Sequence, residues 1–333
     1  MKKPVVILSL CLALLLFGVG AVAESAERET YISGGYTYAL LEDGDAEILL
    51  YGAYEVDPVF REVEDLLIPS VLDGHPVTRI ADRAFYPCRS LVSVTIPDSI
   101  REVGFNPFIG CIDLISITLS PDHPYLETVE GVLFSKEDRR LVCYPSGWTE
   151  TSYVIPEGTR IIGDYAFGNC KTLTDIDIPE SVVSIGNGAF ASCESLSSVS
   201  IPDGITRIGD DTFSLCVRMT DIAMPDSITY IGSFAFYNCI SLSAVTIPEN
   251  VTYIGEYAFV DCSLKTVTIP DSVISIGKDA FHRLPEAYVM DMLIKLNGSA
   301  SVFLPSLVVG HGSYAEQYCI DNHLKYTFAD GST

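Results

Sequence analysis

The chain has little positive charge. Its 333 residues include 20 lysines and arginines against 44 aspartates and glutamates, which gives a formal net charge of −24. A surface of this sign repels nucleic acid and anionic membranes, so neither is an expected partner. Solubility alone explains such a surface, and divalent cations or cationic partners are the alternatives. The hydrophobic content of 48% excludes a disordered chain.

Long apolar runs are also scarce. The one long run, from Val5 to Val19, follows Lys2 and Lys3 and precedes an Ala-Val-Ala cleavage motif that ends at Ala23. This layout is typical of a secretory signal peptide, and the run is short for a membrane anchor, which is the alternative. We therefore expect residues 1–23 to be a signal peptide. The mature protein is expected to be secreted or extracellular and not inserted in the membrane, with association with a cell surface as the alternative to release.

Motifs of catalysis and cofactor binding are missing as well. None of the five histidines belongs to a His-x-x-x-His pair, and the chain has no Cys-x-x-Cys, no Gly-x-Ser-x-Gly and no phosphate-binding glycine loop. Cys143 has no evident histidine partner that would make it a nucleophile. We expect the protein not to be an enzyme, and we predict no catalytic residue, no cofactor and no metal site.

What the chain does contain is a repeat with a step of 23 residues. The segment Ala-Phe-x-x-Cys carries it, with phenylalanines at positions 167, 190, 213, 236 and 259. Each copy has a strand-like Leu-x-x-Val-x-Ile run that ends at proline, and a second run, Val/Ile-x-x-Ile-Gly, whose glycine is expected to permit a tight turn. A constant step of this length indicates one supersecondary unit stacked on copies of itself.

This pattern resembles the BspA-type leucine-rich repeat of bacterial surface and secreted proteins. The match lies in the Leu-x-x-Ile/Val-x-Ile-Pro strand, the Ile-Gly step and the Ala-Phe-x-x-Cys-x-x-Leu segment, over about residues 30 to 328. The resemblance implies a curved, mostly β solenoid with parallel strands and short helical or irregular returns. It also implies, more weakly, adhesion or recognition outside the cell.

Both ends of the repeat array look like caps, which a solenoid needs to cover its terminal coils. Two strand-like runs between Tyr36 and Tyr51 predict a hairpin at the N-terminal end. At the C-terminal end, Ser313 and Glu316 form a capping box that predicts a short helix, followed by a closing strand. The expected organisation is an N-terminal cap at 24–60, an array at 61–285 with a hairpin insertion at about 120–154, and a C-terminal repeat and cap at 286–333.

Seven cysteines share one position of the repeat: Cys88, Cys111, Cys170, Cys193, Cys216, Cys239 and Cys262. Stacked coils would place them in a column with parallel side chains, where a buried thiol acts as a small hydrophobe. We predict a structural ladder of free thiols. Some bridging is the alternative, although parallel side chains do not converge as disulfides or a zinc site require. Cys143 and Cys319 lie outside the column, and their redox state is left open.

A column of acidic residues follows the repeat prolines: Asp98, Glu157, Glu180, Asp203, Asp226, Glu249 and Asp271. The simplest interpretation is turn chemistry, in which the carboxylate holds a backbone N–H just past the strand. Low-affinity calcium binding is the alternative. The free interchange of aspartate and glutamate favours the first.

An aromatic column is the second candidate surface. The position before Ile-Gly holds Arg207, Tyr230 and Tyr253, the position before Ala-Phe holds Phe234 and Tyr257, and Tyr237 lies nearby. Such residues are favoured anchors in protein interfaces, so we predict an exposed partner-binding patch. The alternative is that they shield a coil edge or pack on each other.

The expected function is therefore recognition or adhesion, with a host or neighbouring-cell surface protein as the partner. This expected function rests on the family resemblance, whereas the periodicity predicts only the solenoid fold. A glycan or cell-wall polysaccharide bound by the tyrosines is the first alternative, and a structural protein without a dedicated ligand is the second. The oligomeric state is left open.

Overall fold

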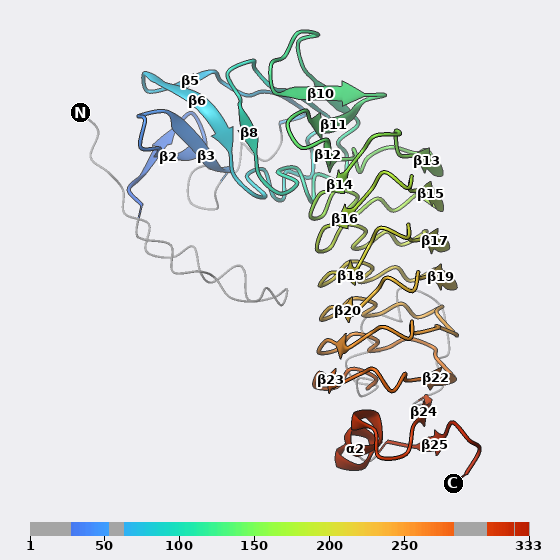
Figure 1. Cartoon of the computed structure of the whole chain (residues 1–333). Helices are drawn as coiled ribbons and strands as arrows, with labels where there is room; N and C mark the ends of the chain where they lie inside the picture. The colour runs from blue at the N-terminus through green and yellow to red at the C-terminus, as the bar shows by residue number, and fades with distance from the viewer. Residues whose placement is uncertain (1–27, 53–62, 283–304, 323, 333) are drawn as a thin grey trace. The chain divides into compact units, whose positions relative to one another are not determined.

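The computed structural model describes residues 28–52, 63–282, 305–322 and 324–332, in two compact units, residues 1–128 and 129–333 (Figure 1). The predicted signal peptide lies outside the described residues. The boundary between the units falls within the segment predicted as a hairpin insertion, and the predicted domain limits stay a prediction. Among the described residues, no helix has the length and apolar character needed to cross a bilayer.

The first unit begins with three antiparallel strands, β1 (Thr30–Ser33), β2 (Tyr36–Leu40) and β3 (Ala46–Tyr51). The pair of β2 and β3 is the hairpin predicted between Tyr36 and Tyr51, and its role as a cap stays a prediction. β3 then pairs in parallel with β6 (His75–Ile80), which pairs in parallel with β8 (Glu102–Val103). The hairpin therefore shares one sheet with the first repeat coils.

The other strands of this unit include the Leu-x-x-Val-x-Ile runs. A parallel sheet joins β4 (Asp65–Leu67), β7 (Ser93–Thr95) and β9 (Ser116–Thr118). The short β5 (Val71–Leu72) pairs antiparallel with β6, and β10 (Leu126–Val129) spans the boundary between the units.

The second unit is a stack of coils with two rows of short parallel strands on opposite sides (Figure 1). It starts with an antiparallel pair, β11 (Val132–Ser135) and β12 (Arg140–Cys143). One row continues from β12 through β14 (Ile161–Ile162), β16 (Ser184–Ile185), β18 (Arg207–Ile208), β20 (Tyr230–Ile231), β21 (Tyr253–Ile254) and β23 (Ser275–Ile276). The other contains β13 (Ser152–Val154), β15 (Asp175–Asp177), β17 (Ser198–Ser200), β19 (Asp221–Ala223), β22 (Thr266–Thr268), β24 (Ser306–Val309) and β25 (Tyr326–Phe328).

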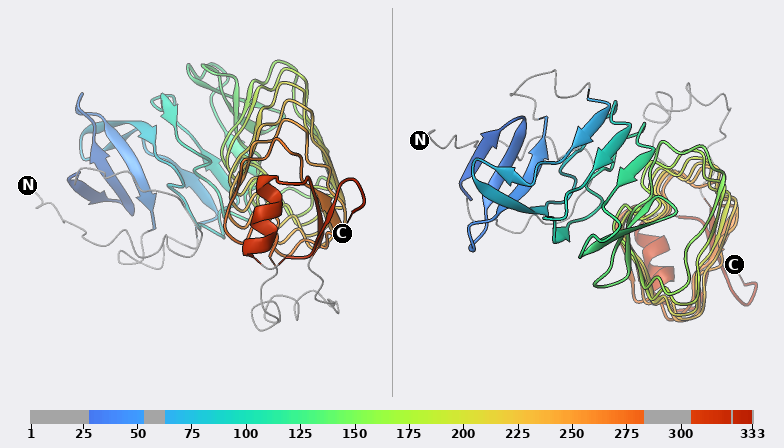
Figure 2. Two further views of the ribbon diagram at one scale, coloured as in Figure 1. Left: turned by 60° about the horizontal axis from the view of Figure 1, so that its bottom comes forward. Right: turned by 90° about the horizontal axis from the view of Figure 1, so that it is seen from above.

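The coils stack in register. Arg207 pairs with Tyr230, and Tyr230 pairs with Tyr253, so equal repeat positions lie side by side. Seen along the stack, successive coils of this unit superpose (Figure 2). This geometry converts every inward or outward position of the repeat into a column.

The inward phenylalanine column forms the centre of the second unit. Its rings stack face to face with centroids 5.1 to 5.5 Å apart, and each ring is at most 2% exposed: Phe167, Phe190, Phe213, Phe236, Phe259 and Phe281. The Ala-Phe-x-x-Cys segments form turns rather than helices, closed by bonds such as that from Cys170 N–H to the Phe167 carbonyl. Burying one such ring stabilises the fold by about 1.5–3 kcal/mol.

The Ile-Gly glycine has a different role from the one predicted. The described glycines at this position have φ values outside the left-handed region, so they do not provide a tight turn. A Cβ on Gly232 would lie 2.5 Å from Asp210 Oδ1 and 2.6 Å from Asp210 N, in the preceding coil. Glycine is needed because neighbouring coils approach too closely for a side chain. The left-handed residues come two positions later, as at Phe234 and Tyr257.

The C-terminal end contains the predicted helix, α2 (Tyr314–Asp321). Ser313 is its N-cap, and Ser313 Oγ accepts the Glu316 N–H at 3.1 Å. The Glu316 carboxylate accepts the N–H of Gly312, one residue before the N-cap, rather than that of Ser313. The helix buries Ala315, Tyr318 and Cys319. The predicted closing strand is β25, which pairs in parallel with β24.

Candidate functional site

The cysteine column lies inside the fold. The nine described cysteines are free and buried. Four of them donate Sγ–H to the phenylalanine carbonyl of the preceding coil at 3.1 to 3.2 Å: Cys193, Cys216, Cys239 and Cys262. Burial raises the pKa of the Cys170, Cys216 and Cys262 thiols well above the ordinary value. These thiols stay protonated, and they join coils without reaching solvent.

The acidic column lies on the surface, and its seven carboxylates are exposed. The predicted turn chemistry is wrong in one respect, because the proline carbonyl closes each turn instead of the carboxylate. Ile205 N–H donates to the Pro202 carbonyl at 3.1 Å, and Ile228 N–H donates to the Pro225 carbonyl at 3.1 Å. Within the described part of the chain, no three His, Cys, Asp or Glu side chains converge as a metal site would require.

The first aromatic column is a continuous stack. The Arg207 guanidinium lies over the Tyr230 ring, 4.9 Å from its centroid, and the Tyr230 and Tyr253 rings are 4.7 Å apart and 4° from parallel. Arg207 is exposed and both tyrosines are half-buried. Their positions, at the first residue of β18, β20 and β21, follow from the in-register pairing of these strands. We call these three residues the Arg-Tyr stack.

A second stack contains the other aromatic residues. The Phe234 and Tyr257 rings are 5.0 Å apart and 18° from parallel, and Tyr237 meets Phe234 edge-on at 5.7 Å. All three are half-buried. Among the described residues, no ring contact joins these rings to the Arg-Tyr stack. The six residues predicted as one patch therefore form two separate stacks, which stay a candidate binding site.

The carboxylate of Asp210 lies near Tyr230 of the Arg-Tyr stack. One carboxylate oxygen of Asp210 accepts the Ser233 N–H at 2.9 Å. The pKa of Tyr230 is raised, first by burial and then by the nearby Asp210 carboxylate, while the Arg207 guanidinium opposes the rise. The hydroxyl therefore stays neutral and keeps its proton for donation.

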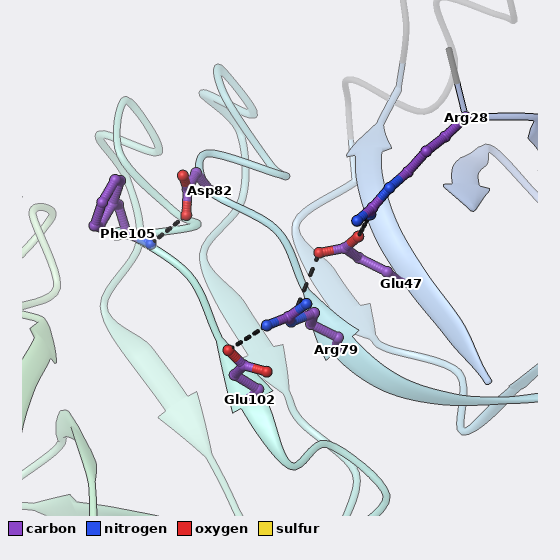
Figure 3. Close-up of polar contacts among 6 residues, drawn as sticks. All are labelled: Arg28, Glu47, Arg79, Asp82, Glu102 and Phe105. Carbon is purple, nitrogen blue, oxygen red and sulfur yellow. Dashed lines mark hydrogen bonds and ion pairs between the residues drawn. The ribbon is translucent and has the colours of Figure 1, made fainter. Parts of the chain in front are cut away.

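A column of charges on the first unit was missed by sequence reasoning (Figure 3). Glu47, Arg79 and Glu102 lie side by side on β3, β6 and β8. Arg79 pairs with Glu102 and lies 3.8 Å from Glu47, which also accepts a hydrogen bond from Arg28 at 2.9 Å. The 23-residue step relates Arg79 to Glu102, whereas the pairing of Glu47 with Arg79 on β3 and β6 lies outside that step.

A related ladder joins backbone and side chains of adjacent coils. In the first unit, the Asp82 carboxylate accepts the Phe105 N–H at 2.7 Å (Figure 3). In the second unit, Asp164 accepts from Asn187 at 3.0 Å, and Asn187 accepts from Asp210 at 3.0 Å. The residue after Ile-Gly thus satisfies the equivalent backbone N–H one coil further on.

These features define the class of protein. It is a parallel β-solenoid of the leucine-rich-repeat type, without a catalytic constellation among its described residues. Residues 65–139 and 160–287 match the BspA type leucine rich repeat region, in 6 copies. The chain therefore belongs to the BspA-type leucine-rich repeat family. No curated protein matches it significantly.

Several solved structures of bacterial leucine-rich repeat proteins are similar to the chain. A leucine-rich repeat protein from Bacteroides ovatus is 24% identical, with 90% of this chain and 67% of that one covered and a TM-score of 0.48. A leucine rich cell surface protein from Faecalibacterium prausnitzii is 26% identical, with 78% and 75% covered and a TM-score of 0.37. The pneumococcal vaccine antigen PcpA is 16% identical, with 90% and 98% covered and a TM-score of 0.46.

Proposed function

We propose that the chain is an exported recognition protein that binds a protein partner outside the cell, through the edges of its two aromatic stacks. Solenoids of this family typically serve as binding scaffolds rather than enzymes. The observation that carries the proposal is the Arg-Tyr stack. It places a guanidinium and two tyrosine hydroxyl edges in one column on a rigid row of strands.

Preorganisation supports this use of the stack. Tyr230 is held by Arg207 on one face and by Tyr253 on the other. Binding through side chains that are already fixed loses less conformational entropy than ordering mobile ones. Tyrosine and arginine are also the residues most often found at the energetic centre of protein interfaces.

The same geometry argues against the polysaccharide alternative. A sugar ring stacks on the open face of an aromatic ring, and both faces of Tyr230 are covered by its neighbours. Phe234 likewise gives one face to Tyr257 and meets the edge of Tyr237. The half-buried rings and the exposed Arg207 favour a protein surface with hydrogen-bond acceptors and apolar patches.

The double variant Tyr230→Ala with Tyr253→Ala tests the proposal. We expect the purified chain to capture a host-matrix or neighbouring-cell surface protein saturably, and the double variant to lose at least about tenfold in affinity. Tyr314→Ala is the matched control, since Tyr314 is an exposed tyrosine on α2. Circular dichroism checks that all variants fold.

Three results would count against the proposal. Capture of cell-wall polysaccharide alone would favour the glycan alternative. Equal loss in the Tyr314→Ala control would place the binding surface elsewhere. Capture of neither class of molecule would leave the structural role. Export has its own test, because N-terminal sequencing of the mature protein is expected to begin at Glu24.

A further inference from the structure

A shallow hollow lies on the second unit beside the turn that joins β11 to β12. Its volume is about 430 Å³, within the range of small-ligand sites. It is lined by two arginines, two acids and two aliphatic residues: Arg139, Arg160, Glu137, Asp138, Ile161 and Val183. The first coils of the solenoid supply Arg160, Ile161 and Val183, and the hairpin turn supplies the other three.

The two arginines occupy the same position of adjacent coils. Arg160 N–H donates to the Arg139 carbonyl at 3.0 Å, and Val183 N–H donates to the Arg160 carbonyl at 2.9 Å. Their backbones are therefore one strand spacing apart, about 4.8 Å. The Arg139 guanidinium lies against Gly158, where an added Cβ would be 3.3 Å from its Nη1.

Neither guanidinium has an ion pair or a side-chain hydrogen bond with any residue that the structure describes, and both are exposed. By contrast, the neighbouring Arg140 pairs with Asp138 at 3.3 Å. In a chain with 44 acidic residues against 20 basic ones, two adjacent arginines without acidic partners are unexpected. Two such forks can together grip one planar oxyanion.

We propose that this hollow binds the C-terminal carboxylate of a peptide that ends in an aliphatic residue. Arg139 and Arg160 donate to the two carboxylate oxygens, and Ile161 with Val183 forms the apolar wall for the last side chain. Val183 is 46% exposed and available for such a contact. This site lies apart in sequence from the two aromatic stacks, and its occupant does not depend on theirs.

The acidic residues of the hollow decide between a peptide end and a polyanion. Glu137 and Asp138 line the hollow together with the two arginines. An extended polyanion, such as an acidic polysaccharide, would carry further negative charges past these carboxylates and be repelled. A single terminal carboxylate with a neutral apolar side chain avoids that repulsion.

Calorimetric titration of the full chain with a short acetylated peptide ending in leucine tests the proposal. We expect saturable binding of the free-carboxylate peptide and none of the same peptide with a C-terminal amide. Arg139→Gln and Arg160→Gln are each expected to weaken binding about tenfold, because each removes a charge-assisted hydrogen bond. Arg218→Gln, which removes an exposed arginine from a later coil, is the matched control and is expected to bind normally.

Equal binding of the acid and amide peptides would overturn the proposal, because it would show that the hollow does not recognise the carboxylate. Failure of both to bind, or equal loss in Arg218→Gln, would also exclude the site. Binding of oligogalacturonate but not of the peptide would assign the arginines to an acidic glycan instead. These outcomes differ from failure of the aromatic stacks, which the tyrosine variants test separately.

Discussion

One outward position of the repeat carries ion pairs in the first unit and stacked rings in the second. In the first unit, Arg79 and Glu102 occupy it on neighbouring strands. In the second unit, Arg207, Tyr230 and Tyr253 occupy it. Because the coils stack in register, whatever the position holds is brought next to the same position of the next coil.

The comparison shows two ways in which an outward column can hold adjacent coils together. Opposite charges alternate at Glu47, Arg79 and Glu102, so neighbouring strands attract one another there. Identical aromatic rings attract one another, so Tyr230 can be followed by Tyr253. The inward residues next to this outward position are aliphatic and buried in both units. The outward column can therefore change in composition without a change in the core.

The largest expected effect tests whether the inward columns are equivalent in the two units. Phe213→Ala and Phe85→Ala each remove a fully buried ring that stacks on another phenylalanine, at 5.5 Å from Phe236 and 5.1 Å from Phe108. We expect each to cost about 3–5 kcal/mol of unfolding free energy in its own unit. Urea unfolding followed by the fluorescence of Trp148, the chain's one tryptophan, reports on the second unit.

Hydrogen exchange of peptides from residues 63–128 reports on the first unit. Ser198→Ala, at an exposed outward position of β17, is the control and is expected to stay within about 0.5 kcal/mol. A cost below 1 kcal/mol at either phenylalanine would mean that its ring column does not hold the coils together.

Much of this arrangement could be predicted from the sequence, because the repeat sets the inward positions. A 23-residue step with Phe213 and Cys216 in phase determines which side chains share a column and which face is buried. The capping box at Ser313 and the hairpin before Tyr51 are local signals that need no tertiary information. Fold, family and inner columns therefore follow from local chemistry and periodicity.

The rest depends on distances between coils, which periodicity does not contain. The Ile-Gly glycine suggested a turn in the sequence. In the structure, glycine is needed at this position because the backbone of the preceding coil lies too close for a side chain, as at Gly232. The six patch residues form two stacks because Phe234 turns toward Tyr257 and Tyr237. The arginine pair at the hollow was missed because Arg139 belongs to the hairpin insertion and not to the regular step.

The second prediction concerns the close approach of coils in both units. A Cβ on Gly104 would lie 2.6 Å from Asp82 N, and a Cβ on Gly232 would lie 2.6 Å from Asp210 N. Because backbone cannot move aside cheaply, we expect Gly104→Ala and Gly232→Ala to destabilise their units by about 1–3 kcal/mol each.

Gly204→Ala is the matched control for these two variants. An added Cβ there meets its nearest atom at 3.5 Å, an ordinary contact, and its φ lies outside the left-handed region. We expect Gly204→Ala to be neutral or slightly stabilising, since alanine restricts the unfolded chain. If all three variants lose the same stability in urea unfolding, the cause is not close packing between coils.

The third prediction follows from the sealed cysteine column. The pKa of Cys216 is raised well above its ordinary 9.0 by burial, so the unfolded state loses this proton first as the pH rises. Stability is therefore full below pH 9 and falls above it, by about 1.4 kcal/mol per thiol between pH 8 and pH 10. Cys216→Ala is expected to remove that share of the fall, measured as the change in unfolding free energy with pH.

Ile231→Val is the control for Cys216→Ala, because it trims the same core without removing a titrating group. It should lower stability equally at every pH. A Cys216→Ala variant with an unchanged pH slope would mean that the thiol ionises in the folded state. Reaction with a thiol reagent at pH 8 gives a second readout, and we expect no labelling of Cys216 before unfolding.

The smallest expected effects compare the charged column of the first unit with the Arg-Tyr stack of the second. A double-mutant cycle on Arg79 and Glu102 is expected to give a coupling of about 0.2–1 kcal/mol, since both side chains are partly exposed. A cycle on Tyr230 and Tyr253 is expected to give about 0.5–1.5 kcal/mol from ring stacking. Each single and double variant is measured by unfolding in urea, with glutamine for the charged residues and leucine for the tyrosines.

Salt separates the two cycles more clearly than their size does. At 1 M salt the screening length falls to about 3 Å, so the Arg79–Glu102 coupling should shrink toward zero. The tyrosine coupling should persist, because it comes from contact between rings and not from net charge. A cycle on Lys171 and Glu194, an exposed pair 2.8 Å apart in the second unit, is the matched control and should follow the charged column. If the tyrosine coupling vanished with salt as well, the stack would be held by Arg207 and Asp210 rather than by its rings, and the two columns would differ in composition only.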